Sequence, residues 1–352
     1  MTPPVAPGGR PAEGEQPFSP RRPEGLTRPR FPARRSYAAL DLGTNNCRML
    51  IARPDGDHFT VVDAFSRIVR LGEGLGASGR LSDAAMDRAV SALSVCAEKL
   101  VRRNVHLARS VATEACRRAA NGPEFVARVY RETGIKLDII SPEEEARLAV
   151  MGCHRLLEEG DGPALVFDIG GGSTELIVIE TKGEEPLTRD WLSVPWGVVS
   201  LSESEGPDPG DLEGRLRAYE RMKLRVCESF AGFAARQNAA MNGPHRLLGT
   251  SGTVTTLASV HLGLPSYDRR AIDGLIVPAD AMRSISGDLA RRSLAERAKL
   301  ACIGQERADL VVAGCAILEA ILDIWPAPRV GVADRGVREG ILKQLMKLGL
   351  RG

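Results

Sequence analysis

The feature that most constrains this chain is a turn pattern that occurs twice. Each copy has a short apolar strand that ends in an Asp, a tight turn of Gly and hydroxyl or amide residues, and a second apolar strand. The first copy covers residues 37–52 and the second covers residues 164–179. Glycine in such a turn lets a phosphate oxygen approach backbone N–H groups, because no Cβ intervenes. The matched pair predicts an α/β fold of two related half-molecules that face each other across a cleft.

Both turns carry candidate phosphate-binding residues. They are Gly43, Thr44, Asn45 and Asn46 in the first turn, and Gly170, Gly171, Gly172, Ser173 and Thr174 in the second. A third turn rich in Gly and hydroxyl residues, at 249–253, stands between a predicted strand and a predicted helix. A helix that begins after such a turn favours an anion through its N–H groups and its dipole, so Ser251 and Gly252 are further candidates. A simple tight turn is an equally good interpretation of this third segment.

Carboxylates beside the two turns are candidate ligands for a divalent cation. Mg²⁺ on phosphates is bound by one or two carboxylates and otherwise by water and phosphate oxygens. Asp41 and Glu175 are the candidates for contact with the cation, and Asp168 is the candidate for supporting the second turn. An Asx-type turn cap is the alternative role for Asp168. The expected cofactor is therefore Mg²⁺ or another divalent cation such as Mn²⁺.

Two charged residues outside the turns complete the candidate site. Ser141 and Pro142 predict a helix start, at which Glu144 would complete a capping box. Glu145 has no part in that cap and is a candidate general base for water. The alternative is a solvated acidic first turn of the helix. Arg117 is a candidate for bidentate phosphate binding, against the alternative of a surface ion pair.

The amino-acid composition limits which cellular compartment and which partners are expected for this protein. None of the seven cysteines forms a Cys-x-x-Cys pair, and the five histidines form no cluster with metal-ligand spacing. This pattern predicts a reduced, cytoplasmic protein without structural zinc. No apolar segment reaches the length of a membrane span, so no membrane partner is expected. Residues 1–35 hold nine prolines, seven arginines and three glutamates, which predicts a disordered basic tail. The rest of the chain is slightly acidic, and no nucleic-acid partner is expected.

Five motifs follow one another in a specific order from about Tyr37 to Leu348. They are Asp41-Leu-Gly-Thr-Asn-Asn, Ala112-Thr-Glu-Ala-Cys-Arg117, Ser141-Pro-Glu-Glu-Glu-Ala-Arg147, Asp168-Ile-Gly-Gly-Gly-Ser-Thr-Glu175 and Gly249-Thr-Ser-Gly-Thr253. The ending Asp334-Arg-Gly-Val-Arg-Glu-Gly340 belongs to the same set. In this order the motifs resemble those of the exopolyphosphatase / guanosine pentaphosphate phosphohydrolase family, in the superfamily of actin-like proteins, sugar kinases and heat-shock ATPases.

The resemblance implies a role for each part of the site. It implies that Glu145 is the catalytic base and that Arg117 contacts phosphate. It also implies that Asp41, Asp168 and Glu175 surround Mg²⁺, while both turns hold the phosphate chain.

The resemblance also implies an architecture. Two ribonuclease-H-like domains, at 36–142 and 143–333, would follow the tail, and a C-terminal helix at 334–352 would return to the first domain. A homodimer is expected on the same basis.

The reaction implied by the resemblance is release of orthophosphate from the end of inorganic polyphosphate. Guanosine pentaphosphate hydrolysis is the alternative within the enzyme class, and a sugar kinase or a non-catalytic sensor of these ligands are alternatives from other classes. The chain departs from the family pattern at Thr44, where members commonly have Ser, and at Asn46, where they have a hydroxyl residue. It also lacks the additional C-terminal helical region of longer members, so processive attack on long chains is not implied.

Overall fold

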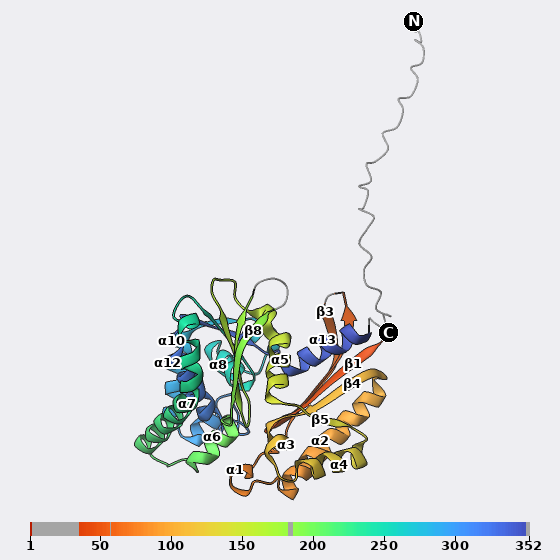
Figure 1. The fold of residues 1–352 in the computed structure, drawn as a ribbon, viewed down its shortest axis with the longest axis horizontal. Helices are drawn as coiled ribbons and strands as arrows, with labels where there is room; N and C mark the ends of the chain where they lie inside the picture. Colours follow the sequence, from red (N-terminus) through yellow and green to blue (C-terminus); the bar gives the residue numbers. More distant parts are fainter. Residues whose placement is uncertain (2–34, 57, 182–185, 350–352) are drawn as a thin grey trace.

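The computed structural model describes residue 1 and residues 35–56, 58–181 and 186–349. The predicted basic tail at 1–35 lies almost entirely outside these residues. The strands of the described part form two sheets, each in its own lobe (Figure 1).

The first sheet has the strand order β3-β2-β1-β4-β5. Its strands are β1 (Ser36–Leu42), β2 (Asn46–Asp55), β3 (His58–Ile68), β4 (Val105–Ala112) and β5 (Leu137–Ile139). β1 pairs antiparallel with β2 and parallel with β4, and the hairpin between β1 and β2 is the first predicted turn. Four helices pack on one face: α1 (Leu75–Ser78), α2 (Asp83–Arg102), α3 (Glu114–Arg118) and α4 (Gly122–Thr133).

The second sheet has the order β10-β11-β9-β6-β7-β8. Its strands are β6 (Ala164–Ile169), β7 (Thr174–Glu180), β8 (Leu187–Val194), β9 (Arg246–Thr250), β10 (Ile276–Pro278) and β11 (Arg329–Ala333). One face is covered by the largest apolar core, to which seven helices contribute. These are α6 (Val198–Glu205), α7 (Leu212–Met241), α8 (Gly252–His261), α9 (Arg269–Ile272), α10 (Ala279–Arg291), α11 (Leu294–Ala298) and α12 (Val311–Ile324). The hairpin between β6 and β7 is the second predicted turn.

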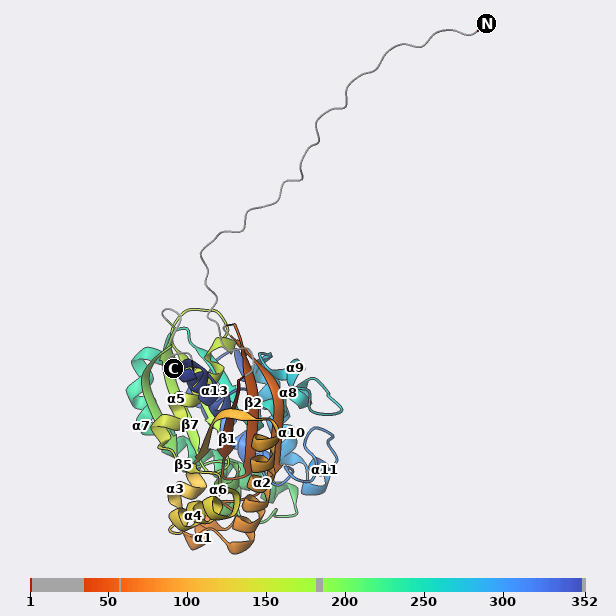
Figure 2. The same ribbon diagram turned by 90° about the vertical axis from the view of Figure 1, so that its right-hand side faces the viewer.

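Two further helices, α5 (Pro142–Cys153, followed by the 3₁₀ turn His154–Leu156) and α13 (Val337–Gly349), lie between the sheets (Figures 1 and 2). Alternate residues of the central strands point to opposite faces. Leu40 therefore packs among the outer helices, whereas Ala39 packs on α13. On the second sheet Phe167 faces outwards and Val166 faces α5. Burial on both faces explains why these strands are continuous apolar runs in the sequence.

The two inner helices touch at glycines. A Cβ added at Gly152 would lie 2.0 Å from the carbonyl oxygen of Gly336, and one added at Gly340 would lie 2.1 Å from that of Leu148. Only glycine permits such a close approach of backbones. The contact holds α13 against both α5 and the first sheet.

The structure confirms the predicted fold class, two ribonuclease-H-like α/β domains that face each other across a cleft. The expected capping box at the start of α5 is only half formed. Ser141 Oγ accepts from the Glu144 amide at 3.2 Å, as expected. However, the Glu144 carboxylate accepts from Arg109 Nη2 at 2.8 Å and does not return to the cap. An ion pair with β4 therefore replaces the second half of the box.

Candidate active site

The two predicted turns have the same internal geometry. Gly43 N–H donates to the Asn46 carbonyl at 2.9 Å, and Gly170 N–H donates to the Ser173 carbonyl at 3.0 Å. The amides of these two glycines are therefore used inside their own turns. Among the described residues, the amides of Thr44 and Gly171 form no hydrogen bond, so they are available to an anion.

The turns meet face to face across the cleft. A Cβ at Gly172 would lie 2.5 Å from Thr44 Oγ1, and one at Gly171 would lie 3.0 Å from the Asn45 amide nitrogen. Glycine is required here because the two loops, one from each domain, approach this closely. Between them lies a small pocket of about 100 Å³, which residues of both domains line.

Six carboxylates line this pocket, and four of them were predicted as site residues from the sequence: Asp41, Glu145, Asp168 and Glu175. The sequence reasoning missed the other two, Glu114 and Asp334. Burial, followed by the charge of Asp41, raises the pKa of Asp168 to about 6. Burial, followed by the charge of Asp168, raises the pKa of Glu175 to about 7, although Ser193 Oγ donates to Glu175 Oε1 at 2.8 Å. When these carboxylates are ionised they repel one another, and a cation bound in the pocket would stabilise their charged form.

Glu145 lies at the buried start of α5 with 9 % of its surface exposed. Burial raises its pKa well above the ordinary value, the charge of Glu175 adds to this effect, and Arg117 opposes it. A carboxylate of raised pKa is a stronger base near neutral pH, which suits proton abstraction from water. The acidic helix start is thus not a solvated surface feature.

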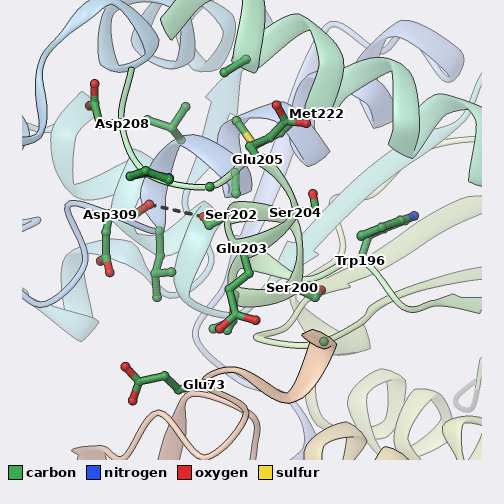
Figure 3. A pocket seen from close by; sticks show the side chains of 18 of the residues that line it. Glu73, Trp196, Ser200, Ser202, Glu203, Ser204, Glu205, Asp208, Met222 and Asp309 are labelled. Atoms are coloured by element: carbon green, nitrogen blue, oxygen red, sulfur yellow. Dashed lines mark hydrogen bonds between the residues drawn. The ribbon is translucent and has the colours of Figure 1, made fainter. Parts of the chain in front are cut away.

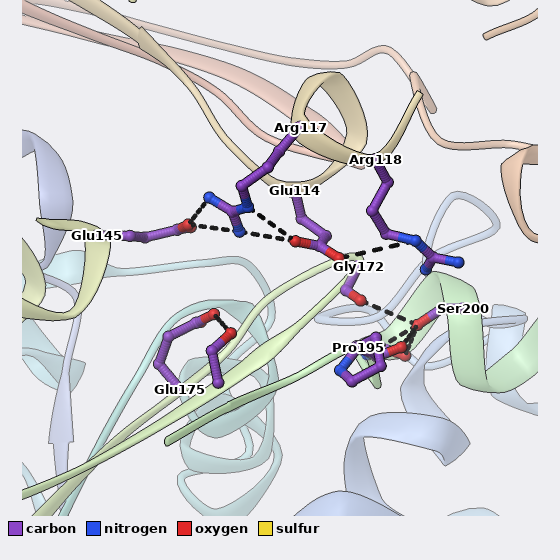
Figure 4. A network of polar contacts seen from close by, with 10 residues as sticks. Glu114, Arg117, Arg118, Glu145, Gly172, Glu175, Pro195 and Ser200 are labelled. Carbon is purple, nitrogen blue, oxygen red and sulfur yellow. Dashed lines mark hydrogen bonds and ion pairs between the residues drawn. The ribbon is translucent and has the colours of Figure 1, made fainter. Parts of the chain in front are cut away.

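Arg117 holds Glu145 in a network of two acids (Figure 4). Its Nη1 donates to Glu145 Oε2 at 3.2 Å and to the Ile140 carbonyl at 2.7 Å. Its Nη2 donates to Glu114 Oε2 at 2.7 Å. The Arg117 guanidinium is partly buried, so its ion pairs are not the surface ion pair considered as the alternative. Both of its Nη atoms already donate to protein oxygens, so they cannot bind a phosphate in this same geometry. We infer that Arg117 orients the Glu145 carboxylate.

Not every candidate from the sequence reaches the pocket. The Thr174 hydroxyl donates to the Trp196 carbonyl at 2.7 Å, and its residue is completely buried. Thr174 begins β7 and therefore has a structural role instead of a phosphate contact. Ser251 lines the pocket, whereas Gly252 lies beside it as the first residue of α8.

Three arginines that line the pocket were missed by the sequence reasoning: Arg335, which donates to Asp273 Oδ2 at 2.6 Å, and Arg48 and Arg338. Arg48 lies opposite Asp41 in the β1–β2 pairing, and Arg338 stands in the first turn of α13. Among the described residues, neither forms an ion pair. A cation in the first turn of a helix opposes the helix dipole, and an Arg within a buried strand is unusual. Either observation could have marked these residues as anion ligands.

The donor set fits a hard divalent cation. Among the described residues, no three His, Cys, Asp or Glu side chains converge closely enough to bind a metal ion by themselves. Mg²⁺ needs fewer protein ligands, because it keeps waters and binds substrate phosphates. Asp41, Asp168 and Glu175 offer carboxylate oxygens, and Asn45 Oδ1 is a buried acceptor without a hydrogen-bond partner. A divalent cation at this pocket would take one or two of these oxygens as direct ligands and would keep water or substrate phosphate in its other positions.

The raised pKa values of Asp168 and Glu175 predict that the folded protein becomes less stable as the pH rises. A carboxylate whose pKa is higher in the folded state binds more protons when folded, so the free energy of unfolding falls as pH rises through the interval. For Asp168 and Glu175 that interval runs from about 4 to about 7. In a chelator, we expect the Tm to be lower at pH 8 than at pH 5, on the order of 5 °C.

Mg²⁺ should reduce this decrease in Tm between pH 5 and pH 8, because a bound cation stabilises the charged carboxylates. Thermal unfolding at both pH values, with chelator or Mg²⁺, measures the effect. A Tm that rises between pH 5 and pH 8 in the chelator would contradict the buried, mutually repelling carboxylates.

Comparison with known proteins agrees with this geometry. The model of the Ppx/GppA phosphatase family matches residues 50–348. A guanosine-5'-triphosphate,3'-diphosphate pyrophosphatase from Aeromonas salmonicida is 30 % identical over 316 residues, covering 88 % of this chain and 59 % of that protein. Exopolyphosphatase 1 of Mycobacterium leprae is 29 % identical over 305 residues, covering 86 % of this chain and 87 % of its own. This chain thus spans less than two thirds of the Aeromonas protein but most of the mycobacterial one.

A solved structure supports the same assignment. The crystal structure of an exopolyphosphatase from Cytophaga hutchinsonii has a TM-score of 0.78 to this structure at 25 % sequence identity, covering 89 % of this chain and 98 % of that chain. The family match extends over most of the sequence and includes the β6–β7 turn, Glu145 and the start of α13. The chain therefore belongs to the Ppx/GppA phosphatase family.

Proposed function

We propose that this protein is an exopolyphosphatase that hydrolyses the terminal phosphoanhydride bond of inorganic polyphosphate. The observation that carries the proposal is the position of Glu145. Glu145 is buried beside the two turns that have free backbone amides, and Arg117 fixes the orientation of its carboxylate through a hydrogen bond. Such a group orients water towards a phosphorus atom that the turns hold.

The reaction follows from these positions. The terminal phosphate binds the amides of Thr44 and Gly171, and Arg48 and Arg338 neutralise its charge. Glu145 accepts a proton from water while the water oxygen bonds to the terminal phosphorus. The bond from that phosphorus to the bridging oxygen breaks, and the shortened chain leaves with the electron pair. Mg²⁺ would supply additional positive charge at the phosphate oxygens.

Guanosine pentaphosphate hydrolysis is the second candidate. It is favoured by the similarity to the Aeromonas pyrophosphatase. Both substrates present a terminal phosphate on an anhydride bond. The fuller coverage of the mycobacterial exopolyphosphatase supports polyphosphate as the first choice.

The deciding experiment measures Mg²⁺-dependent phosphate release from tripolyphosphate, long-chain polyphosphate and guanosine pentaphosphate in parallel. We expect turnover of polyphosphate far above that of the nucleotide. The reverse preference would place the protein in alarmone metabolism. Silence on all three with a folded protein would favour a ligand-binding sensor.

We further propose a homodimer in the cytoplasm, on the strength of the family resemblance. The seven cysteines all lie in the described part of the chain and are free thiols there. Among the described residues, no helix combines the length and the apolarity that a membrane crossing requires. Light scattering on the purified protein would test the dimer.

A further inference from the structure

A short segment after β3, residues 69–74, is bound directly to the first of the two turns. The Arg70 amide donates to the Asn45 carbonyl oxygen at 3.0 Å. The Gly72 amide donates to the Thr44 carbonyl oxygen at 2.9 Å, and a Cβ added at Gly72 would lie 2.3 Å from Thr44 Cγ2. A displacement of this segment would therefore also displace the turn whose Thr44 amide is available to an anion.

The Arg70 side chain leaves this segment and reaches the second domain. Its Nη1 donates to Asp309 Oδ2 at 2.8 Å, and its Nη2 donates to Asp309 Oδ1 at 3.4 Å. Arg70 has a φ of +46°, a conformation that persists in a residue with a Cβ only where the surrounding contacts hold it. Its neighbours Val69 and Leu71 are buried in the first-domain core, and Ala308 is buried in the second-domain core. The ion pair therefore connects two rigidly packed parts of the molecule.

In the second domain, α6 links Asp309 to the second turn. Ser202 Oγ on α6 donates to the Asp309 carbonyl oxygen at 3.3 Å (Figure 3). At the start of the same helix, the Val199 amide donates to the Gly171 carbonyl oxygen at 2.8 Å. Because α6 is one short helix, its two ends move together. A continuous set of contacts thus runs from the first turn through Arg70 and Asp309 to the second turn.

A second contact between the domains lies close to this ion pair. Glu203 points from α6 towards the first domain (Figure 3), and its Oε1 accepts from the Gly74 amide at 2.9 Å. Both contacts lie at the edge of a cavity of about 990 Å³ that residues of both domains line. Asn45 lines this cavity as well as the catalytic pocket. Because the cavity interrupts the packing between the domains, the polar contacts at its edge hold the domains at a fixed separation there.

We propose that Arg70 and Asp309 are positioning residues for phosphate hydrolysis. Their ion pair fixes the distance between the two turns, so that the amides of Thr44 and Gly171 meet the same phosphate group. This inference rests on the proposed function, since it gives residues that do not touch the substrate a role in that reaction. The Glu203 contact supports the same alignment.

Arg70→Ala and Asp309→Ala test this role by steady-state kinetics. Each should lower kcat for tripolyphosphate about tenfold, because small displacements of reacting groups have large effects on rate. The KM should change less, since every phosphate-binding group is retained. Removal of the second partner should add little to removal of the first, because the two residues act as one pair. Arg70→Lys keeps the charge and should recover part of the rate.

The matched control is Arg128→Ala. Arg128 pairs with Asp87 at 2.7 Å, and its side chain is 29 % exposed against 34 % for Arg70, but both partners of this pair belong to the first domain. This variant should keep the kcat and the KM of the wild type. All variants should stay within about 4 °C of the wild-type Tm, because partly exposed ion pairs contribute little to stability.

Two kinetic results would overturn the proposal: an unchanged kcat for Asp309→Ala, or a loss in the double variant equal to the product of the two single losses. The second result would mean that the two residues act independently of each other.

If the wild-type protein releases no phosphate, the proposed function fails, and hydrogen exchange resolved to single amides decides whether the turns are linked. Asp309→Ala changes the second domain, yet it should speed the exchange of the Val69, Arg70 and Gly72 amides, which donate to the first turn. Unchanged exchange at these three amides would reject the link.

Discussion

Glu145→Ala is expected to lower kcat for phosphate release by about 100- to 10,000-fold, the usual contribution of a positioned general base. Substrate binding should be largely spared, because the turns and arginines that hold phosphate do not depend on this carboxylate. The fold should persist as well. Arg117 keeps its bonds to Glu114 and to the Ile140 carbonyl, and removal of one of four repelling carboxylates relieves the raised pKa values of the others.

Glu145→Gln is the stricter form of this experiment, since it keeps the shape and removes only the basicity. Glu143→Ala is the matched control, because Glu143 lies two residues away on the same helix but is exposed. Steady-state kinetics and substrate titration on all three variants separate kcat from affinity. A Glu145→Ala protein whose kcat stays within tenfold of the parent would show that another group activates the water.

Gly171→Ala should lower kcat/KM by about 100-fold or more, because displacing reacting groups by even 1 Å can have that effect. The new methyl carbon would lie 2.9 Å from Thr44 Cβ and 3.0 Å from the Asn45 amide nitrogen. Residue 171 cannot shift away from Thr44 and Asn45, because the backbone of Gly197 packs behind it. The position of a Cβ at Gly197 lies 2.4 Å from the Gly171 carbonyl carbon. The two domains must therefore separate at the catalytic turns.

The control for this steric effect is Gly232→Ala. Gly232 lies within α7, and a Cβ there would meet no atom within 4 Å. That variant should retain full activity and gain up to about 1 kcal/mol of stability from helix propensity. Circular dichroism and phosphate release measure both changes. Normal activity of Gly171→Ala would mean that the turns do not close on the substrate as tightly as this structure shows.

Local chemistry made much of the site predictable. An apolar run that ends in Asp and Gly predicts a buried strand and a tight turn from a few adjacent residues, which is why both hairpins and their carboxylates were located. Glu145 was found by elimination, since Ser141 and Pro142 already explain the helix start. The same local reasoning misjudged Glu144, because its ion-pair partner Arg109 is 35 residues away on β4.

The arginines show the limit of such reasoning. Arg48 follows the first turn, but its place at the site depends on the fold, which brings it to the same pocket as Asp168 and Ser251 of the other domain. Thr174 illustrates the reverse error, since a residue inside a motif can point away from the site.

By itself, the sequence determined the two strand–turn–strand units, the start of α5 and the family, because each depends on short segments or on the order of motifs. Only the tertiary structure decided which side chains meet. It brought the four predicted carboxylates into one pocket, directed Arg117 to Glu145, and placed Arg48 and Arg338 at the pocket with no ion pair among the described residues. The physical reason is that desolvation and charge repulsion depend on distances between residues far apart in the chain.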